Sequence, residues 1–290
     1  PYPARYVQML SLIPNSWNIN WLKGDTDKWG AKPDGWMLPF STNDYYQNPY
    51  WSAYQDSQYD ERDRVTANAN LRYDITDWLF LNGRIGTEKG ILKVTSIDAY
   101  GFLRGNVAGT GEVTEFTTNE NQLNAEYSLN FNKAFGSFNV IAMFGGSATR
   151  STYNRDGLRG DQLLIPFYHV ITNAGQLYTN VSNSKSGINS LYGSAEASYK
   201  DLVYLTVTGR NDWFSTLAPK NNSIFYPSVG LSYLLHNQIT FPEWWSFAKI
   251  RASYAEVGGG SSAYATKIGY NFDATGYLST PLVSLPDGIA

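Results

Sequence analysis

Two pairs of acidic residues are the first candidates for chemistry, Asp25 with Asp27 and Glu61 with Asp63, each pair separated by one position. Glycoside hydrolysis requires two carboxyl groups held about 5–10 Å apart across a cleft, one of them with a raised pKa. Acidic loops also bind divalent cations. Both pairs stand in polar, glycine-rich or charge-rich sequence, which is typical of solvated loop charge. The sequence therefore favours solvated carboxylates over a catalytic or a metal site.

The other residues with catalytic chemistry are few. The two histidines, His169 and His236, match no metal-ligand spacing and are predicted to be ordinary loop or interface residues. The glycine-rich stretch 105–111 lacks the Lys-Ser/Thr of a phosphate-binding loop, so we interpret it as a flexible loop. The chain has no cysteine and no nucleophile elbow. We expect no enzyme, no catalytic residue, no metal ligand and no cofactor.

Aromatic side chains near the start of the chain are the better candidates for binding. Five of the nine tryptophans occur within the first 51 residues, in a segment without sustained alternation that is predicted to be an ordered loop. Aromatic rings stack on the apolar faces of sugars. Ligand contact is predicted for six residues: Trp36, Tyr45, Tyr46, Tyr50, Trp51 and, later in the chain, Trp213. The alternative, that the loop rings form a small core of their own or pack on a partner, is favoured because ordered loops need a core.

The composition limits the class of protein that holds these residues. The net charge is −3, which excludes the basic surplus expected of a nucleic-acid partner. Charged residues make up 16%, below the roughly 25% of soluble domains, and aromatic residues make up another 16%. No apolar run reaches the roughly 20 residues of a membrane-spanning helix. This composition suits a β-rich protein with aromatic surfaces.

Apolar and polar residues alternate over long stretches, which predicts β-strands. From Val65 to Ile75 the alternation is unbroken, and a two-residue gap at Thr76-Asp77 leads to a second strand. The pattern recurs and predicts eight strands at about 62–75, 78–88, 117–132, 137–150, 187–199, 202–213, 225–235 and 247–257. Short connections mostly alternate with long ones, and aromatic residues crowd the short turns. Both asymmetries are typical of transmembrane β-barrels.

On this interpretation the apolar face, with Leu71, Leu123, Leu129 and Leu205, contacts lipid, and the polar face lines the lumen. Arg210 and Asp212 are expected to project to one side and to pair with each other or with a plug. A structural role, bracing the wall to the plug or to a loop, is favoured over direct contact with substrate. The predicted lumen-facing structural residues are Arg72, Asp74, Arg84, Glu126, Arg210, Asp212 and Arg251. The alternative is a sheet with one face in water.

The strand pattern also predicts the organisation of the chain. Residues 1–61 are expected to form an extracellular aromatic-rich loop region, and residues 62–257 antiparallel barrel strands with long extracellular loops at 89–116, 151–186 and 214–224. Residues 258–290 are expected to be a further extracellular loop or the start of the next strand. With no Met or leader at its start, the chain is interpreted as a mature product or an internal fragment.

Several segments carry a family resemblance when taken in order. These are Asn48-Pro49-Tyr50-Trp51, the first hairpin from Leu71 to Leu79, Thr208-Gly209-Arg210-Asn211-Asp212-Trp213, Phe225-Tyr226-Pro227-Ser228-Val229 and Lys249-Ile250-Arg251-Ala252-Ser253-Tyr254. Together they resemble the barrel of the SusC/RagA family of TonB-dependent outer-membrane transporters of Bacteroidetes. The fold class expected is all-β, an antiparallel transmembrane β-barrel segment of about eight strands from a larger plugged barrel.

The resemblance implies a function and partners. Family members have about 22 strands, an N-terminal plug, and energy supplied by TonB. They sit in the bacterial outer membrane and import glycans or peptides with a SusD-like surface lipoprotein, and this chain would be part of such a wall. It lacks the plug and the TonB-contact segment, so TonB would act through the missing region. The alternative is a soluble glycan-binding or glycan-cleaving β-sandwich, and a third option is a self-contained eight-stranded barrel.

Overall fold

The fold is that of a computed structural model, which describes residues 9–24, 27–39, 47–102, 109–239, 242, 244–266, 271–277 and 280–284. Two compact units share the chain: residues 1–65, 89–120 and 153–183 form the first, and residues 66–88, 121–152 and 184–290 form the second. The division falls within the first five strands of the sheet.

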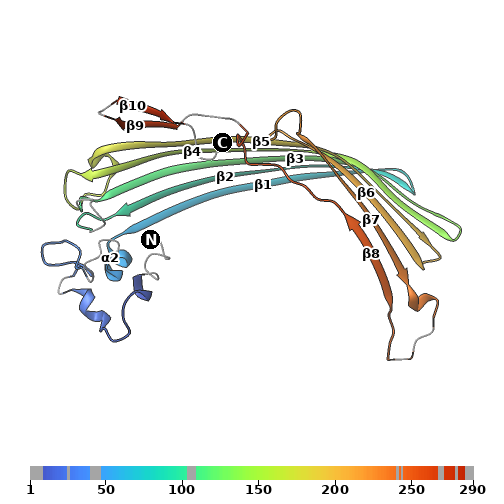
Figure 1. Cartoon of the computed structure of the whole chain (residues 1–290), viewed down its shortest axis with the longest axis horizontal. Coiled ribbons are helices and arrows are strands. Elements are labelled where there is room, and N and C mark those ends of the chain that lie inside the picture. Colours follow the sequence, from blue (N-terminus) through green and yellow to red (C-terminus); the bar gives the residue numbers. More distant parts are fainter. Residues whose placement is uncertain are drawn as a thin grey trace. The chain divides into compact units, whose positions relative to one another are not determined.

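One antiparallel sheet of eight strands dominates the molecule. Its members follow chain order, so every strand pairs with its neighbours in sequence (Figure 1). They are β1 (Ser57–Thr76), β2 (Leu79–Asp98), β3 (Glu112–Phe135), β4 (Phe138–Leu163), β5 (Ala174–Tyr199), β6 (Val203–Phe214), β7 (Ser223–Leu234) and β8 (Lys249–Ala255). Among the described residues β1 does not pair with β8. The predicted antiparallel all-β segment is confirmed, and the self-contained eight-stranded barrel is not formed.

The remaining elements are small. Strands β9 (Asn271–Tyr277) and β10 (Thr280–Ser284) form a separate hairpin in the region predicted to be a loop or a further strand. The helical elements are η1 (Ile19–Lys23), α2 (Pro49–Tyr54), η2 (Ile171–Asn173) and η3 (Leu235–Asn237). Within the described ranges, no helix has the length and apolar character needed to cross a membrane.

The short turns of the second unit lie beside one another. Lys200 and Asp201 both adopt positive φ, 51° and 52°, and Leu202 N–H donates to Tyr199 O at 2.9 Å. Two positive φ values give the turn twist that joins antiparallel strands tightly. The Lys200 N–H donates to Ser137 O at 2.8 Å, which ties this turn to the β3–β4 turn. Rings also gather here, with the Phe138 and Tyr199 centroids 4.7 Å apart. The predicted clustering of aromatic residues at the short turns is thus confirmed.

The strands extend well beyond their predicted ends. β2 continues to Asp98 and β3 starts at Glu112, so the loop predicted at 89–116 shrinks to residues 99–111. The loop predicted at 151–186 likewise shrinks to 164–173, and that at 214–224 to 215–222. The added strand residues, such as the polar run 182–186, do not alternate in hydrophobicity. Backbone pairing with a neighbouring strand suffices to hold them extended, and that pairing leaves no hydrophobic signal.

In the first unit, a small core orders the aromatic-rich segment. Trp51 is 1% exposed and packs with Ala31, Met37, Ala99 and Phe102. The buried Asn48 begins helix α2: its Oδ1 accepts from Tyr50 N–H at 2.9 Å, and its Nδ2 donates to Leu22 O at 2.7 Å and to Leu38 O at 2.9 Å. Pro49 occupies the first helical turn, where its missing N–H costs nothing. The Asn-Pro-Tyr-Trp motif therefore caps a helix and anchors the segment.

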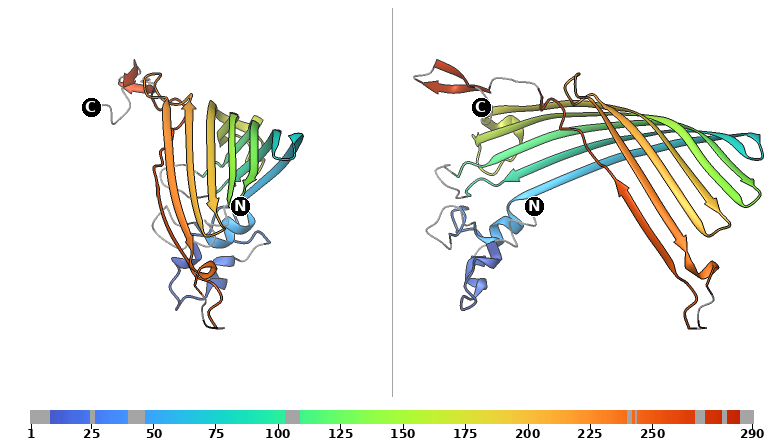
Figure 2. Two further views of the ribbon diagram at one scale, coloured as in Figure 1. Left: turned by 90° about the vertical axis from the view of Figure 1, so that its right-hand side faces the viewer. Right: turned by 45° about the vertical axis from the view of Figure 1, so that its right-hand side comes forward.

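Strands β5 to β8 lie side by side in every view (Figure 2). Within the second unit their registers give them two chemically different faces. Val207 on β6 is opposite Ala195 on β5 and Val229 on β7, and Val229 is opposite Tyr254 on β8. The next residue of β6, Thr208, is opposite Ser194 and Ser228. Since successive side chains of a strand point to opposite faces, one face is apolar and the other carries hydroxyls and charges.

Candidate functional site on the polar face of the sheet

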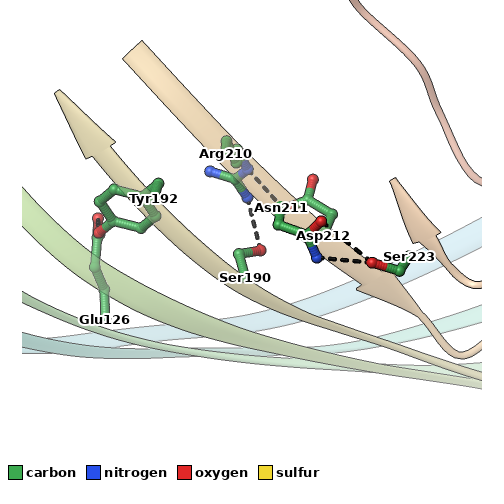
Figure 3. A network of polar contacts seen from close by, with 7 residues as sticks. All are labelled: Glu126, Ser190, Tyr192, Arg210, Asn211, Asp212 and Ser223. Atoms are coloured by element: carbon green, nitrogen blue, oxygen red, sulfur yellow. Dashed lines mark hydrogen bonds and ion pairs between the residues drawn. The ribbon is translucent and has the colours of Figure 1, made fainter. Parts of the chain in front are cut away.

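An ion pair on β6 is the centre of the polar face. Arg210 Nε donates to Asp212 Oδ1 at 2.7 Å, and Arg210 NH2 donates to Ser190 Oγ on β5 at 2.9 Å (Figure 3). The Asp212 side chain is 11% exposed and that of Arg210 is 45% exposed. Burying a carboxylate costs free energy unless a cation and hydrogen bonds compensate it, and Arg210 supplies both. The prediction that the two residues project to one side and pair is confirmed.

A second contact bridges β5 and β3 across β4. The Tyr192 hydroxyl donates to Glu126 Oε1 (Figure 3), and the Arg210 guanidinium lies 5.6 Å from the centre of the Tyr192 ring. Gly145 on β4 makes the crossing possible, because a Cβ there would lie 3.0 Å from Tyr192 Cε2. Glu126 and Arg210, both predicted from sequence, thus contact the same tyrosine.

Hydroxyl groups fill the rest of this face. Thr206 Oγ1 donates to Glu196 Oε2 at 3.0 Å, and the hydroxyls of Thr208 and Ser228 hydrogen-bond to each other. Tyr192, Arg210 and Tyr226 form one row across three strands by register. Such a surface offers many donors and acceptors at modest strength, which suits weak contact with the hydroxyls of sugars or with peptide groups.

The other residues predicted for the lumen are more exposed. Arg72 pairs with Asp74 at 2.8 Å and stacks its guanidinium 3.9 Å from the centre of the Phe80 ring. Arg84 is exposed, and Arg251 is exposed opposite Ser232 in the β7–β8 register. In the described part of the chain, these two arginines form no ion pair.

In the first unit, three rings and a histidine surround the backbone at Tyr100. Trp36 and Phe167 both meet the Tyr100 ring edge-on, with centroids 6.0 and 5.4 Å away, and Lys28 Nζ lies 4.5 Å from the centre of the Phe167 ring. The Tyr100 N–H donates to His169 Nε2 at 2.9 Å. Burial, and secondly the charge of Lys28, hold the pKa of His169 below its ordinary value of 6.5. His169 therefore accepts this hydrogen bond as a neutral imidazole. It lies in the connection between β4 and β5, in agreement with the prediction of a loop residue.

The structure separates the six aromatic residues predicted to bind ligand. Trp36 and Tyr50 are half-buried, and Tyr45 and Tyr46 lie outside the described residues. The prediction is wrong for Trp51, whose ring fills the core of the first unit and is only 1% exposed. For Trp213 ligand contact stays a prediction, and its register with Asn189 and Ser223 sets it on the opposite face from Arg210 and Asp212.

The remaining sequence candidates that the structure describes lie apart from one another. Glu61 and Asp63 lie in β1 rather than in a loop, and Glu61 pairs with Lys93 at 3.4 Å. Asp27 is exposed, whereas Asp25 and most of the glycine-rich stretch lie outside the described residues. His236 Nδ1 donates to Ala248 O at 3.1 Å, and the ring packs on Phe247. Within the described ranges, no three acidic or histidine side chains converge as a metal site would require.

Tyr192 and Gly145 are the site residues that sequence reasoning missed. A signal for Tyr192 was present, because it occupies the same alternate positions of its strand as Glu196. No local pattern marks Gly145, whose role depends on a side chain from another strand.

Comparisons with known proteins agree with this architecture. Residues 13–281 match the family described as TonB dependent receptor-like, beta-barrel. TonB-dependent receptor P3 of Formosa agariphila is 25% identical over 249 residues, which cover 80% of this chain and 24% of that protein. TonB-dependent receptor P26 of the same organism is 28% identical over 166 residues, 51% of this chain and 16% of that protein. The chain therefore spans a quarter or less of these relatives.

Solved structures show the same fold. The RagAB peptide transporter superposes with a TM-score of 0.68 at 15% identity, covering 89% of this chain and 30% of that one. The RagAB peptide importer in its open-open state gives a TM-score of 0.63 at 14% identity, covering 88% and 29%.

The chain belongs to the TonB-dependent receptor-like β-barrel family. Members of this family are located in the bacterial outer membrane and work with TonB. The predicted resemblance is confirmed, and so is the outer-membrane location. The alternative of a soluble β-sandwich is wrong.

Proposed function

We propose that this chain forms part of the wall of an importer, with the polar face of β5 to β8 lining the passage and the apolar face in contact with lipid. The observation that carries the proposal is the division of the two faces over the middle of four registered strands, where Val207, Val229 and Tyr254 share one face and Thr208 and Ser228 the other. In a membrane barrel, lipid accepts only apolar side chains, whereas a water-filled interior accepts polar ones.

The substrate proposed is an oligosaccharide or a peptide, taken up without chemical change. The hydroxyls, carboxylates and tyrosine rings around Arg210 offer hydrogen bonds and stacking surfaces to either class. The structural neighbours are a peptide transporter and a peptide importer by their names, which supports a large polar cargo. Trp36, Tyr45, Tyr46 and Tyr50 remain proposed contacts at the outer side.

The proposed partner is a surface lipoprotein of the SusD kind, with energy supplied by TonB. On this proposal residues 1–61 and the connections 99–111, 164–173 and 215–222 face the cell exterior, where a lipoprotein could deliver cargo. The ion pair of Arg210 and Asp212 braces the wall against a plug or a loop.

Cysteine labelling tests the assignment of the faces, because the chain contains no natural cysteine. Single cysteines would replace Leu205, Thr206, Val207 and Thr208 in the complete gene product in bilayers. A charged maleimide should label positions 206 and 208 and leave 205 and 207 unlabelled. Equal labelling of all four positions contradicts the proposal. Binding of labelled oligosaccharides and peptides to the purified protein then identifies the class of cargo.

A further inference from the structure

A basic pocket lies on the apolar face, near the end of β6 that is far from the Lys200 turn. Its volume is about 590 Å³, and its lining includes Arg150, Lys185, Asn189, Trp213 and Tyr264. Trp213 and Asn189 are register partners on the apolar face of the sheet. Lys185 and Gly187 precede Asn189 at alternate positions of β5, so they belong to the same face.

Gly187 allows Arg150 to lie across β5 at this site. A Cβ at Gly187 would be 3.2 Å from Arg150 Cδ, so any side chain there would displace the arginine. Arg150 NH1 donates to Thr149 O at 2.8 Å and to Ile188 O at 3.2 Å, and NH2 donates to Asn189 Oδ1 at 2.7 Å. All three acceptors are uncharged, so the hydrogen bonds fix the guanidinium without neutralising it.

The pocket therefore holds two uncompensated positive charges. Neither Arg150 nor Lys185 pairs with a carboxylate in the described part of the chain, and no acidic residue lines the pocket. Its floor is fixed by the Gly187 N–H, which donates to Ser215 Oγ at 2.8 Å. A fixed guanidinium and a lysine ammonium beside a tryptophan ring favour an anion such as a phosphate.

An apolar groove lies on the same face, toward the middle of β6. It encloses about 570 Å³ and is lined by Gly193, Val207, Gly209, Phe225, Val229 and Tyr254. Gly193 and Gly209 are register partners and bring no side chain of their own to the floor of the groove, where the Phe225 ring lies against Gly209. Four residues of strand separate Gly209 from Trp213, about 13 Å at 3.3 Å per residue. A long acyl chain can cover that distance.

We propose that Arg150 and Lys185 bind the phosphate of an anionic lipid in the outer leaflet, whose acyl chain lies in the groove over Gly193 and Gly209. The inference rests on the proposed function in two respects, that the apolar face contacts lipid and that the connection 215–222 faces the cell exterior. A free anion would gain nothing from the groove, and imported cargo would meet the polar face. A lipid uses both features, and tryptophan at the pocket suits the boundary between head groups and acyl chains.

The test measures lipid binding by the complete gene product in a non-ionic detergent, by native mass spectrometry. The probes are lipid A, phosphatidylethanolamine and inorganic phosphate. The double variant Arg150→Gln/Lys185→Gln should bind lipid A about 30-fold more weakly, the effect expected of two surface charges. Lys220→Gln, which removes an exposed lysine of the β6–β7 connection, is the matched control and should change nothing.

A second pair of variants tests the groove. Gly193→Leu should weaken lipid A binding, whereas Gly193→Ala should not, because a Cβ there meets its nearest neighbour at an ordinary 3.4 Å. Lys185→Gln alone removes no side-chain hydrogen bond found among the described residues, so it reports on charge even if the Arg150 variant fails to fold.

Two results would overturn the inference. One is unchanged lipid A binding in Lys185→Gln and in the double variant. The other is inorganic phosphate binding as tightly as lipid A, which indicates a free-anion site. Uptake of oligosaccharides and peptides is measured on the same proteins. If uptake is absent but lipid binding follows the pattern above, the proposed cargo fails and the lipid site stands.

Discussion

The aromatic-rich segment of residues 9–56 and the sheet of β5 to β8 use the same residue types in different ways. In the described part of the segment, Trp51 is 1% exposed and stabilises a core by leaving water. In the sheet, Trp213 is 37% exposed on a face of Leu, Val and Phe side chains that are also exposed. The sheet is ordered by its backbone ladder, and on the proposed function its apolar face contacts lipid rather than protein. An aromatic residue is thus a sign of a core in one region and of a membrane surface in the other.

The largest loss of stability is expected when a buried ring of the aromatic-rich segment is removed. Trp51→Ala should cost about 3–5 kcal/mol, because it removes a large ring from a closed core. Limited proteolysis and amide exchange of the complete gene product should show residues 47–56 opening. Trp21→Ala is the control, since Trp21 is 69% exposed and its loss should cost no more than about 0.5 kcal/mol. Equal effects of the two variants would break the distinction between core and surface aromatic residues.

An arginine introduced into β6 should lower the stability of the sheet much more on the apolar face than on the polar face. Val207→Arg, opposite Ala195 and Val229, should cost about 2–4 kcal/mol when folding is measured in bilayers, because lipid does not solvate the guanidinium. Thr206→Arg is the matched neighbour on the polar face, opposite Glu196, and should cost little. A comparable loss of stability at both positions would contradict the facing assignment.

Two Arg-Asp pairs of the second unit, Arg72 with Asp74 and Arg210 with Asp212, have the same spacing in sequence but differ in burial. Arg210→Ala should cost about 1–2 kcal/mol, because it leaves the buried Asp212 carboxylate without its cation in a site that is only partly desolvated. Arg72→Ala should cost less than about 1 kcal/mol, because both members of its pair are exposed. Adding Asp212→Asn to Arg210→Ala should recover part of the loss. Denaturant titration gives the values, and identical costs for the two arginines would refute the role of burial.

The smallest effect is a pH response near Tyr100. The pKa of His169 is lowered in the folded protein, so the unfolded chain binds more protons at pH values between the lowered pKa and about 6.5. Stability from this contact is complete above that window and is lost as the pH falls through it. Protonation at Nε2 also removes the acceptor for the Tyr100 N–H. Amide exchange at Tyr100, corrected for intrinsic rates, should therefore accelerate from pH 7.5 to pH 5.5 in the native chain. In His169→Gln the corrected rate should not depend on pH, and a persistent response would assign it to another group.

The sequence alone determined the strands whose two faces differ in chemistry. Alternation predicted the β5–β6 hairpin, and it predicted that Arg210 and Asp212 project to the same face of their strand. Both predictions use only the two-residue period of a strand, which does not depend on the neighbouring strand. The ordered motifs also predicted the family. Alternation could not predict the outer parts of β2 to β5, where polar residues occupy both faces and only pairing with a neighbour keeps the strand extended.

Only the tertiary structure decided which aromatic residues are buried and which polar residues meet. Trp36 and Trp51 are close in a segment of one composition, yet one stays half-exposed and the other fills a core closed by Ala99 and Phe102. Tyr192 reaches Glu126 only because Gly145, from the strand between them, presents no side chain. Burial and cross-strand contact depend on residues distant in sequence, and a local pattern contains no information about those partners.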